Sequence, residues 1–95
     1  MEIRWSPEAA ADLAAIIRYI RQDHARAALR VARTIVRTVD QLKSFPNRGR
    51  PGRVAGTREL VFPPLPFVVV YRVKQDAVEI ARVLHGAQRW PTIDK

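Results

Sequence analysis

The spacing of hydrophobic residues changes along this chain close to Pro46. Through most of residues 7–44, apolar side chains recur at intervals of three and four, which is the period of an amphipathic helix. In residues 58–84 they alternate or form short continuous runs, which is typical of β-strands. A chain with this order can bury both kinds of apolar surface at once only by laying helices against a sheet. The fold class predicted from the pattern is therefore α+β.

Two helices are predicted before Pro46. The letters SPE at residues 6–8 suit a helix start, because serine caps free N–H groups and proline tolerates the first helical position. The first helix is expected over about residues 7–22 and the second over about 25–44, since the residue before a proline is pushed out of helical geometry. The positions predicted to face the core are Ala9, Leu13, Ile16, Ile20, Ala28, Ala32, Ile35, Val39 and Leu42.

Four strands are predicted around the helices. Residues 2–5 alternate polar and apolar, and three further strand-like runs cover residues 58–62, 67–73 and 77–84. Short turn segments separate the last three, so an antiparallel meander is expected. The run FVVVYRV is apolar on both alternations and is predicted to be central. With 95 residues the chain is too short for two cores. The prediction is one domain over residues 1–95, ordered β-α-α-β-β-β, with a helical hairpin on one face of a small, mainly antiparallel sheet.

The charge of the chain points to an acidic partner. Seventeen Lys and Arg residues against nine Asp and Glu give a formal net charge of +8, and fourteen of the seventeen are arginine. The flat guanidinium group matches carboxylate and phosphate oxygens two at a time, so an acidic protein or a nucleic acid is the expected ligand. A GC-rich genome, which favours arginine and alanine, is the alternative explanation of this composition.

Two groups of arginines are candidate partner-binding residues. On the second predicted helix, four arginines share the face opposite the apolar stripe, although neighbouring like charges repel. The loop of residues 46–57 carries further arginines among glycines and prolines and is longer than most connections between elements. An ordinary solvated helix face and a plain connecting loop are the alternatives. The residues in question are Arg26, Arg30, Arg33, Arg37, Arg50 and Arg53.

A cluster of polar residues follows the last predicted strand, within the letters VEIARVLHGAQRWP at residues 78–91. Alternation places Arg82 on the same side as apolar neighbours, so it requires an anionic partner: Glu59, Glu79 or a group from outside the chain. Trp90 is either a platform for a base or a hydrophobic plug over the end of the sheet, and its position beside a proline favours the plug. Arg89 and Trp90 are further candidates for partner binding.

The same region offers one possible catalytic set. His85 could carry a proton near neutral pH, while Arg58 and Arg82 could bind phosphate, as a ribonuclease without a metal would require. A histidine at a strand end is also a common structural hydrogen-bonding residue. The chain has no cysteine, and its two histidines are far apart. Neither a metal site nor a cofactor is therefore predicted.

Taken together, these segments resemble the RelE/ParE superfamily of bacterial toxins from type II toxin–antitoxin modules. The resemblance covers about residues 3–90 and rests on the order of several motifs: SPEAAADLAAIIRYI, LKSFPNRGRPGR, GTRELVF, FVVVYR and VEIARVLHGAQRW. It implies the β-α-α-β-β-β fold, an intracellular toxin, and a co-produced acidic antitoxin that wraps the toxin in a hetero-oligomer. The cytoplasm is the expected location, since no signal peptide is predicted. No segment for membrane insertion is predicted.

The superfamily has two branches with different targets. RelE-like members cleave messenger RNA on the ribosome, and the resemblance places Arg58 near a basic position and His85 near the C-terminal polar position of that branch; Arg82 joins this set by its chemistry alone. Val68, however, stands where that branch is expected to carry an arginine on the sheet, and no tyrosine follows His85. ParE-like members inhibit DNA gyrase without being nucleases, and they share the residue pattern of the segments PFVVVYRV and VEIARVLH. The ParE-like branch is therefore favoured, the RelE-like branch is the alternative, and a non-toxic basic nucleic-acid-binding domain is the third possibility.

Overall fold

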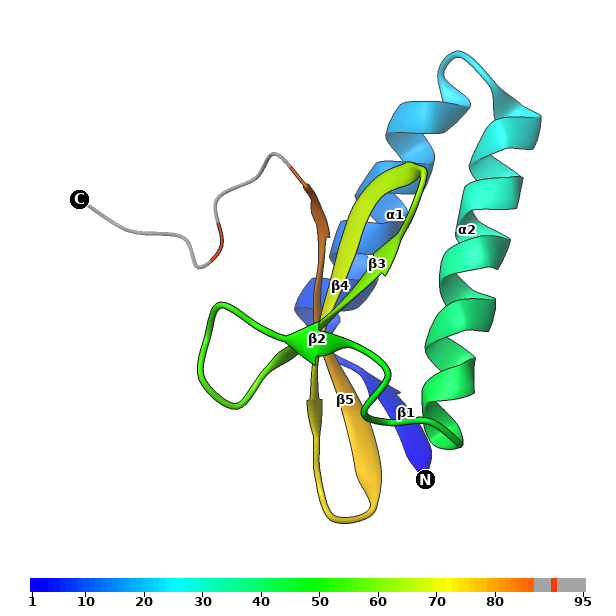
Figure 1. Ribbon diagram of the computed structural model, residues 1–95. Coiled ribbons are helices and arrows are strands. Elements are labelled where there is room, and N and C mark those ends of the chain that lie inside the picture. Colours follow the sequence, from blue (N-terminus) through cyan, green and yellow to red (C-terminus); the bar gives the residue numbers. More distant parts are fainter. Residues whose placement is uncertain (87–89, 91–95) are drawn as a thin grey trace.

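The computed structural model describes residues 1–86 and Trp90. A helical hairpin lies along one side of a sheet, and the chain enters the hairpin from the first strand and leaves it for the others (Figure 1). In chain order, the elements are β1 (Glu2–Trp5), α1 (Pro7–Arg21), α2 (Ala25–Asp40), the 3-10 turn η1 (Gln41–Lys43), β2 (Arg50–Pro51), β3 (Arg58–Phe62), β4 (Leu65–Val73) and β5 (Ala77–His85).

The five strands form one sheet in the order β1-β5-β4-β3-β2. Only β1 and β5 run parallel to each other; the remaining neighbours are antiparallel. The sheet is therefore mainly antiparallel, with β4 at its centre, which confirms the predicted fold class and the predicted central strand. The helices in the described residues include none that is long and apolar enough to cross a membrane.

Several boundaries differ from the sequence prediction, among them the start of β4, which lies at Leu65 and not at residue 67. Helix α2 ends at Asp40 and continues as the 3-10 turn η1, whereas the sequence suggested a helix up to residue 44. In addition, the predicted loop of residues 46–57 contains the short strand β2, because Arg50 pairs with Glu59 across an antiparallel ladder. The N–H of Gly52 donates to the carbonyl of Thr57 at 2.8 Å and closes this hairpin.

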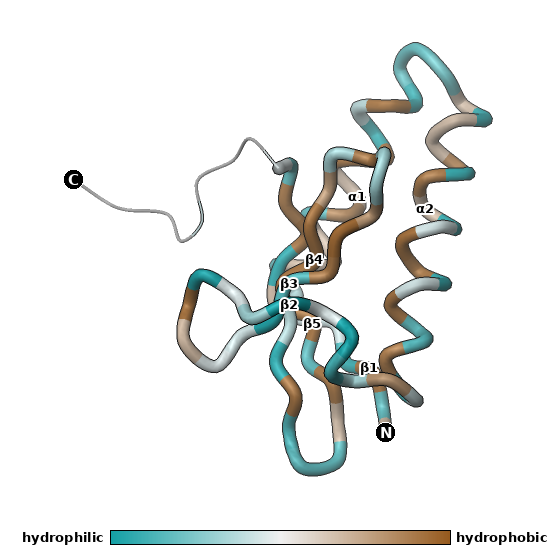
Figure 2. The backbone as a smooth tube through the Cα atoms, in the orientation of Figure 1, coloured by the Kyte–Doolittle hydropathy of each residue, from teal (hydrophilic) through white to brown (hydrophobic). Residues whose placement is uncertain are grey.

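The core lies between the helices and the sheet. Figure 2 shows the hydrophobic positions of α2 directed toward the sheet and its hydrophilic positions directed away from it. Helix α1 packs its predicted stripe against the same core. The described core-facing residues include Ala9, Leu13, Ile16, Ile20, Ile35, Val39, Leu42, Leu60, Val69, Tyr71, Val78, Ile80 and Val83.

A β-bulge in β5 changes which side chains face the helices. Val70 pairs with Arg82, but the next residue of β4, Tyr71, pairs with Ile80, so Ala81 is an extra residue in β5. The strict alternation that placed Arg82 beside Val78 and Ile80 is therefore wrong. Since a bulge shifts the alternation by one residue, Val83 joins the helix-side core while Leu84 packs on the opposite face with Val68 and Val70.

Candidate partner-binding surfaces

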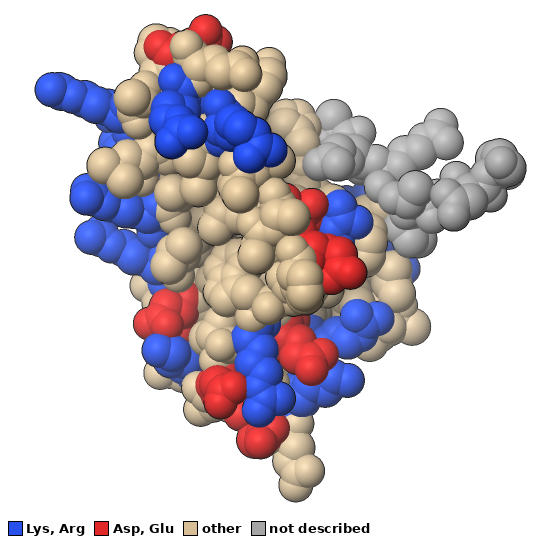
Figure 3. Space-filling model, turned by 180° about the vertical axis from the view of Figure 1, so that it is seen from behind, with Lys and Arg blue, Asp and Glu red and all other residues tan. Residues whose placement is uncertain are grey.

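The four arginines of α2 lie on the outer surface of the molecule. Arg26, Arg30, Arg33 and Arg37 are all exposed, and none of them forms an ion pair with another side chain in the described part of the chain. Figure 3 shows basic side chains projecting from the edge of the molecule that α2 forms, whereas acidic and basic groups are mixed near β1. This edge therefore presents positive charge that an acidic ligand can use.

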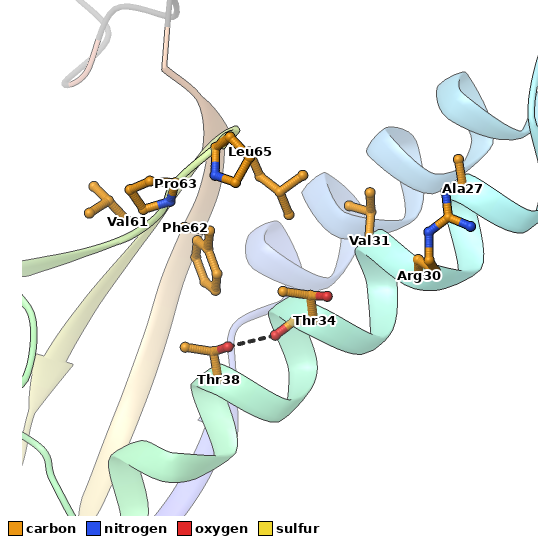
Figure 4. Close-up of a pocket in the computed structure, with 10 residues that line it drawn as sticks. Ala27, Arg30, Val31, Thr34, Thr38, Val61, Phe62, Pro63 and Leu65 are labelled. Atoms are coloured by element: carbon orange, nitrogen blue, oxygen red, sulfur yellow. Dashed lines mark hydrogen bonds between the residues drawn. The ribbon is translucent and has the colours of Figure 1, made fainter.

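A cavity of about 610 Å³ lies beside these arginines, between α2 and the β3–β4 hairpin. Val31 and Leu65 face each other across it, and Phe62 forms its base (Figure 4). Thr34 and Thr38 add hydroxyl groups on the helix side, and the Thr38 hydroxyl donates to the Thr34 carbonyl at 2.8 Å. The wall is thus mostly apolar, with Arg30 at its margin.

A second cavity of about 610 Å³ continues from the first. It lies between α1 and the start of β4 and includes Tyr19, Phe67 and His85 in its wall. Val31 and Leu65 line both cavities, so the two adjoin. We call the combined depression the helix–hairpin groove. Tyr19 is one of the most exposed large apolar residues of the described chain, at 74% exposure. An apolar groove of this extent beside a basic helix is typical of a protein-binding site.

Arg50 and Arg53 both contact one buried carboxylate. Glu59 is only 2% exposed, and its side chain accepts hydrogen bonds from the Arg50 guanidinium at 3.2 Å and from the Arg53 backbone N–H at 3.0 Å. Burial raises the pKa of Glu59, but these hydrogen bonds and the two positive charges outweigh it and hold the pKa below its ordinary value. The two guanidinium groups remain about half exposed and so can also meet an external ligand.

Arg58 is engaged by the backbone of the segment before β2. Its Nη1 donates to the carbonyl oxygen of Gly49 at 2.6 Å and to that of Asn47 at 3.3 Å. Fully buried Tyr71 holds the same segment: its hydroxyl donates to the Pro46 carbonyl at 2.7 Å and accepts from the Gly49 N–H at 2.8 Å. Burial raises the pKa of the Tyr71 hydroxyl, more than the Gly49 N–H and the charge of Arg58 lower it, so the hydroxyl keeps its proton.

Arg82 pairs with Asp12 of helix α1, not with Glu59 or Glu79. Its Nε and Nη2 donate to the two carboxylate oxygens of Asp12 at 2.6 and 3.0 Å. The hydrogen-bonded carboxylate raises the pKa of Arg82. Asp12 also accepts from the Val83 backbone N–H at 2.9 Å. The anionic partner that Arg82 requires therefore comes from inside the chain, from Asp12 and from neither of the two predicted glutamates.

The remaining predicted site residues lie near the end of β5. His85 is exposed at the last position of β5, with its ring edge-on to Phe67 at a centroid distance of 5.9 Å. Trp90 packs against the cluster of Val68 and Leu84 on the face away from the helices, as a plug would, and the guanidinium carbon of Arg82 lies 5.7 Å from its ring centroid. Arg89 lies outside the described residues.

The structure thus brings Arg50 and Arg53 together on Glu59, and Arg82 together with Trp90, but it does not gather the proposed catalytic residues at one point through any described contact. Sequence reasoning missed Asp12 and the groove around Val31. A signal for Asp12 existed, because position 12 is one turn after Ala9 on the edge of the apolar stripe of α1. The groove has no comparable signal, since its walls come from four separate segments.

Comparison with known proteins gives consistent matches along the chain. Residues 3–90 match the family described as ParE toxin of the type II toxin–antitoxin system parDE. Y4kP of Sinorhizobium fredii, which is named as a toxin, is 44% identical over 91 residues, covering 96% of this chain and 94% of that protein. Toxin RelE2 of Caulobacter vibrioides is 40% identical over 87 residues, covering 92% and 97% of the two chains.

Solved structures show the same fold. A chain from the chromosomal ParDE toxin–antitoxin system of P. aeruginosa is 33% identical and superposes with a TM-score of 0.80, covering 90% of this chain and 95% of that one. A chain from the toxin–antitoxin complex RelBE2 of Mycobacterium tuberculosis is 23% identical, with a TM-score of 0.67 and coverage of 88% and 95%. The second likeness concerns the fold alone.

Proposed function

Because this chain belongs to the ParE toxin family of type II toxin–antitoxin systems, we propose that it arrests growth by binding DNA gyrase and is neutralised by an acidic antitoxin. Gyrase inhibition requires a protein-binding surface and no catalytic centre. The antitoxin, gyrase and the cytoplasmic location are the expectations that the sequence raised, and the contacts described below support the first two.

The observation that carries the proposal is the engagement of both candidate catalytic arginines within the chain. Arg82 gives two donors to Asp12, and Arg58 is bonded to two backbone carbonyls. A phosphate group would have to compete with these partners at short distance. In addition, Val68 is a buried apolar residue at the position where a nuclease of this superfamily is expected to carry an arginine. These features favour a binding toxin over a nuclease.

Purified gyrase provides the direct test. We expect the toxin to inhibit DNA supercoiling by gyrase in a dose-dependent way and to induce filamentation with DNA damage signals when it is produced alone. Co-production of the neighbouring open reading frame should restore growth. A toxin that arrests growth while gyrase supercoils DNA at the normal rate would contradict the gyrase proposal, and a chain without any effect on growth would indicate a non-toxic basic domain.

The helix–hairpin groove and the adjacent arginines of α2 together suit an acidic, amphipathic antitoxin segment. An amphipathic acidic segment could bury its apolar side chains against Val31 and Leu65 while its carboxylates meet Arg30 and its neighbours. The groove supplies apolar burial, and the guanidinium groups supply attraction that weakens with salt.

Charge reversal on α2 tests this arrangement. The double variant Arg30→Glu, Arg33→Glu should weaken antitoxin binding and reduce its dependence on salt, as measured by titration at several NaCl concentrations. The control is Arg72→Glu, Lys74→Glu, which changes the net charge equally at the end of β4 and directly after it. Equal losses in the two variants would mean that only the overall charge matters, and an unchanged affinity would mean that the α2 arginines are merely solvated.

A second candidate function is supported by the 40% identity to toxin RelE2 and by the exposed position of His85 at the end of β5. In this alternative the protein is a ribosome-dependent endoribonuclease in which His85 handles a proton and Arg58 and Arg82 bind phosphate. Its signature would be rapid loss of protein synthesis with cleaved messages. The His85→Ala variant should then lose message cleavage; cleavage at the wild-type rate would exclude His85 as the proton carrier.

A further inference from the structure

The corner between η1 and β2 exposes an aromatic ring. Phe45 is 64% exposed, although burying a phenyl group is normally favourable. It borders an open cavity of about 600 Å³ lined by Ser44, Phe45, Pro46, Asn47 and Arg48, so no acidic residue lines it within the described chain. We call these five residues the Phe45 corner. The corner combines an exposed aromatic ring with an exposed arginine, two residue types that are enriched at the centres of protein interfaces.

The backbone of the Phe45 corner is held on both sides of the ring. The Phe45 N–H donates to the carbonyl of Gln41, in the preceding turn, at 3.1 Å. The Arg48 N–H donates to the Phe45 carbonyl at 3.2 Å. The Arg48 guanidinium also donates to the Gln41 side chain. After Phe45, Tyr71 holds the Pro46 carbonyl and the Gly49 N–H, and Arg58 holds the Gly49 carbonyl.

These hydrogen bonds lower the entropic cost of binding a partner at the Phe45 corner. An ordinary loop loses backbone freedom when a partner immobilises it, whereas this segment is already fixed by a fully buried tyrosine and by Arg58. An exposed ring on a fixed backbone can therefore serve as an anchor at low entropic cost. The hydrogen bond from Arg58 to the Gly49 carbonyl thus helps to position the Phe45 corner.

The Phe45 corner is separate from the helix–hairpin groove. The two have no lining residue in common. The corner follows the C-terminal end of α2, whereas the tip of the β3–β4 hairpin lies near the opposite end of the sheet (Figure 1). A ligand that fills the groove thus leaves the corner available in the described part of the molecule.

We propose that the Phe45 corner is the contact through which this toxin grips its protein target, and that the antitoxin binds mainly elsewhere, in the helix–hairpin groove. The target would offer an apolar recess for Phe45 with acidic groups at its rim for Arg48, since the corner itself is apolar and basic. This inference rests on the proposed function as a protein-binding toxin, and it adds the surface and the chemistry of the site on the target.

A protein fits the Phe45 corner better than a nucleic acid does. Single-stranded nucleic acid binds to several stacked aromatic rings with a line of cations for the phosphates. The lining of the corner has one ring and one cation, which is fewer of both than such a ligand requires. A single aromatic anchor with a neighbouring arginine is instead the pattern of a protein hot spot.

The test compares Phe45→Ala with Val73→Ala, which also truncates an exposed apolar side chain but lies outside the lining of the Phe45 corner. Each variant is produced at matched levels, its melting temperature is checked, and three quantities are measured: growth arrest, binding to purified gyrase, and binding to the antitoxin. Phe45→Ala should lose growth arrest and weaken gyrase binding by about tenfold or more while keeping antitoxin affinity. Val73→Ala should behave as wild type, and Phe45→Trp should retain activity.

Wild-type growth arrest by Phe45→Ala would overturn the inference, as would an equal loss of target and antitoxin binding. So would a loss of affinity for single-stranded RNA or DNA with no change in protein binding. The proposed function can fail independently: if wild-type toxin does not bind gyrase, but Phe45→Ala still abolishes growth arrest and keeps antitoxin affinity, the target is a different protein and the role of the corner stands.

Discussion

At the scale of single residues, arginine serves two different purposes in this protein. Arg58 and Arg82 bind groups of the chain itself, whereas Arg30 and its neighbours on α2 are open to solvent in the described structure. The position of Asp12 at the edge of the apolar stripe of α1 does not say which arginine it meets, because Asp12 is 70 positions away from Arg82. Only folding brings that carboxylate and that guanidinium together. The Asp12–Arg82 pair also supplies an acceptor to the Val83 N–H.

Removing Asp12 should therefore destabilise the fold. Asp12→Ala leaves the Arg82 guanidinium and the Val83 N–H without their acceptor, and we expect a loss of about 2 kcal/mol in the free energy of unfolding. For a domain of this size that lowers the melting temperature by roughly 10 °C. Asp12→Asn, which keeps an acceptor oxygen but no charge, should fall between. Asp23→Ala in the exposed turn between the helices is the control, and equal melting temperatures for Asp12→Ala and Asp23→Ala would contradict the expectation.

Glu59 should make stability depend on acid. Its pKa is lower in the folded protein than its ordinary value, so its ionised form contributes stability that is fully present above the pKa of the unfolded chain. That contribution is lost as the pH falls below about 4.5 and through the folded pKa. Urea unfolding between pH 7 and pH 3 should show the loss in wild type and a smaller loss in Glu59→Gln. Parallel curves for the two proteins would show that Glu59 has no such role.

At the scale of elements, the packing of α1 and β5 depends on a bulge. Strand β1 pairs with β5 only as far as Ile80, and beyond that point side chains of α1 and its cap replace a strand. The Ser6 hydroxyl donates to the Ala81 carbonyl at 2.9 Å while capping α1 by accepting from the Ala9 N–H at 3.0 Å. The same serine that signals a helix start in the sequence therefore also satisfies the bulge. The segment before β2 likewise packs closely against the sheet, because Gly49 lies directly against Tyr71 and the backbone of Glu59.

Gly49→Ala should be costly, in contrast to a similar change at another turn. A Cβ at position 49 would lie 2.7 Å from the Tyr71 hydroxyl oxygen and 2.9 Å from the Glu59 carbonyl oxygen. Since a backbone atom cannot move aside easily, we expect destabilisation of about 1–3 kcal/mol. Gly86→Ala is the control, because its Cβ would meet the Pro66 carbonyl at an ordinary 3.4 Å. The melting temperatures of the two variants test this expectation. A Gly49→Ala protein as stable as Gly86→Ala would show that the segment around Gly49 can shift without cost.

At the scale of the whole molecule, a small core supports a strongly basic surface. The helical hairpin and sheet enclose the main core, and a net charge of +8 opposes compaction by self-repulsion. A domain of 95 residues buries a modest share of its surface, and the helix–hairpin groove leaves further apolar area uncovered. An acidic ligand in the groove would reduce the repulsion between positive charges and would also cover the exposed apolar area.

The antitoxin should therefore raise the melting temperature of the toxin. A ligand that binds only the folded state adds about 4 kcal/mol at a thousand times its Kd, which corresponds to roughly 15–30 °C for a domain of this size. Calorimetry of the toxin with increasing antitoxin should show this rise, and Arg30→Glu, Arg33→Glu should reduce it at equal antitoxin concentration. A melting temperature independent of antitoxin would contradict a ligand that binds the folded toxin.

The sequence by itself determined the order and type of the main elements, because hydrophobic period, the Ser6-Pro7 helix start and Pro46 are local signals that tertiary packing did not override. It also determined that α2 carries its arginines opposite the core. The tertiary structure decided which charges are free, where β5 bulges, and that a groove runs beside α2. Those features arise from contacts between segments far apart in the chain, and no local pattern of residues records which of them will meet.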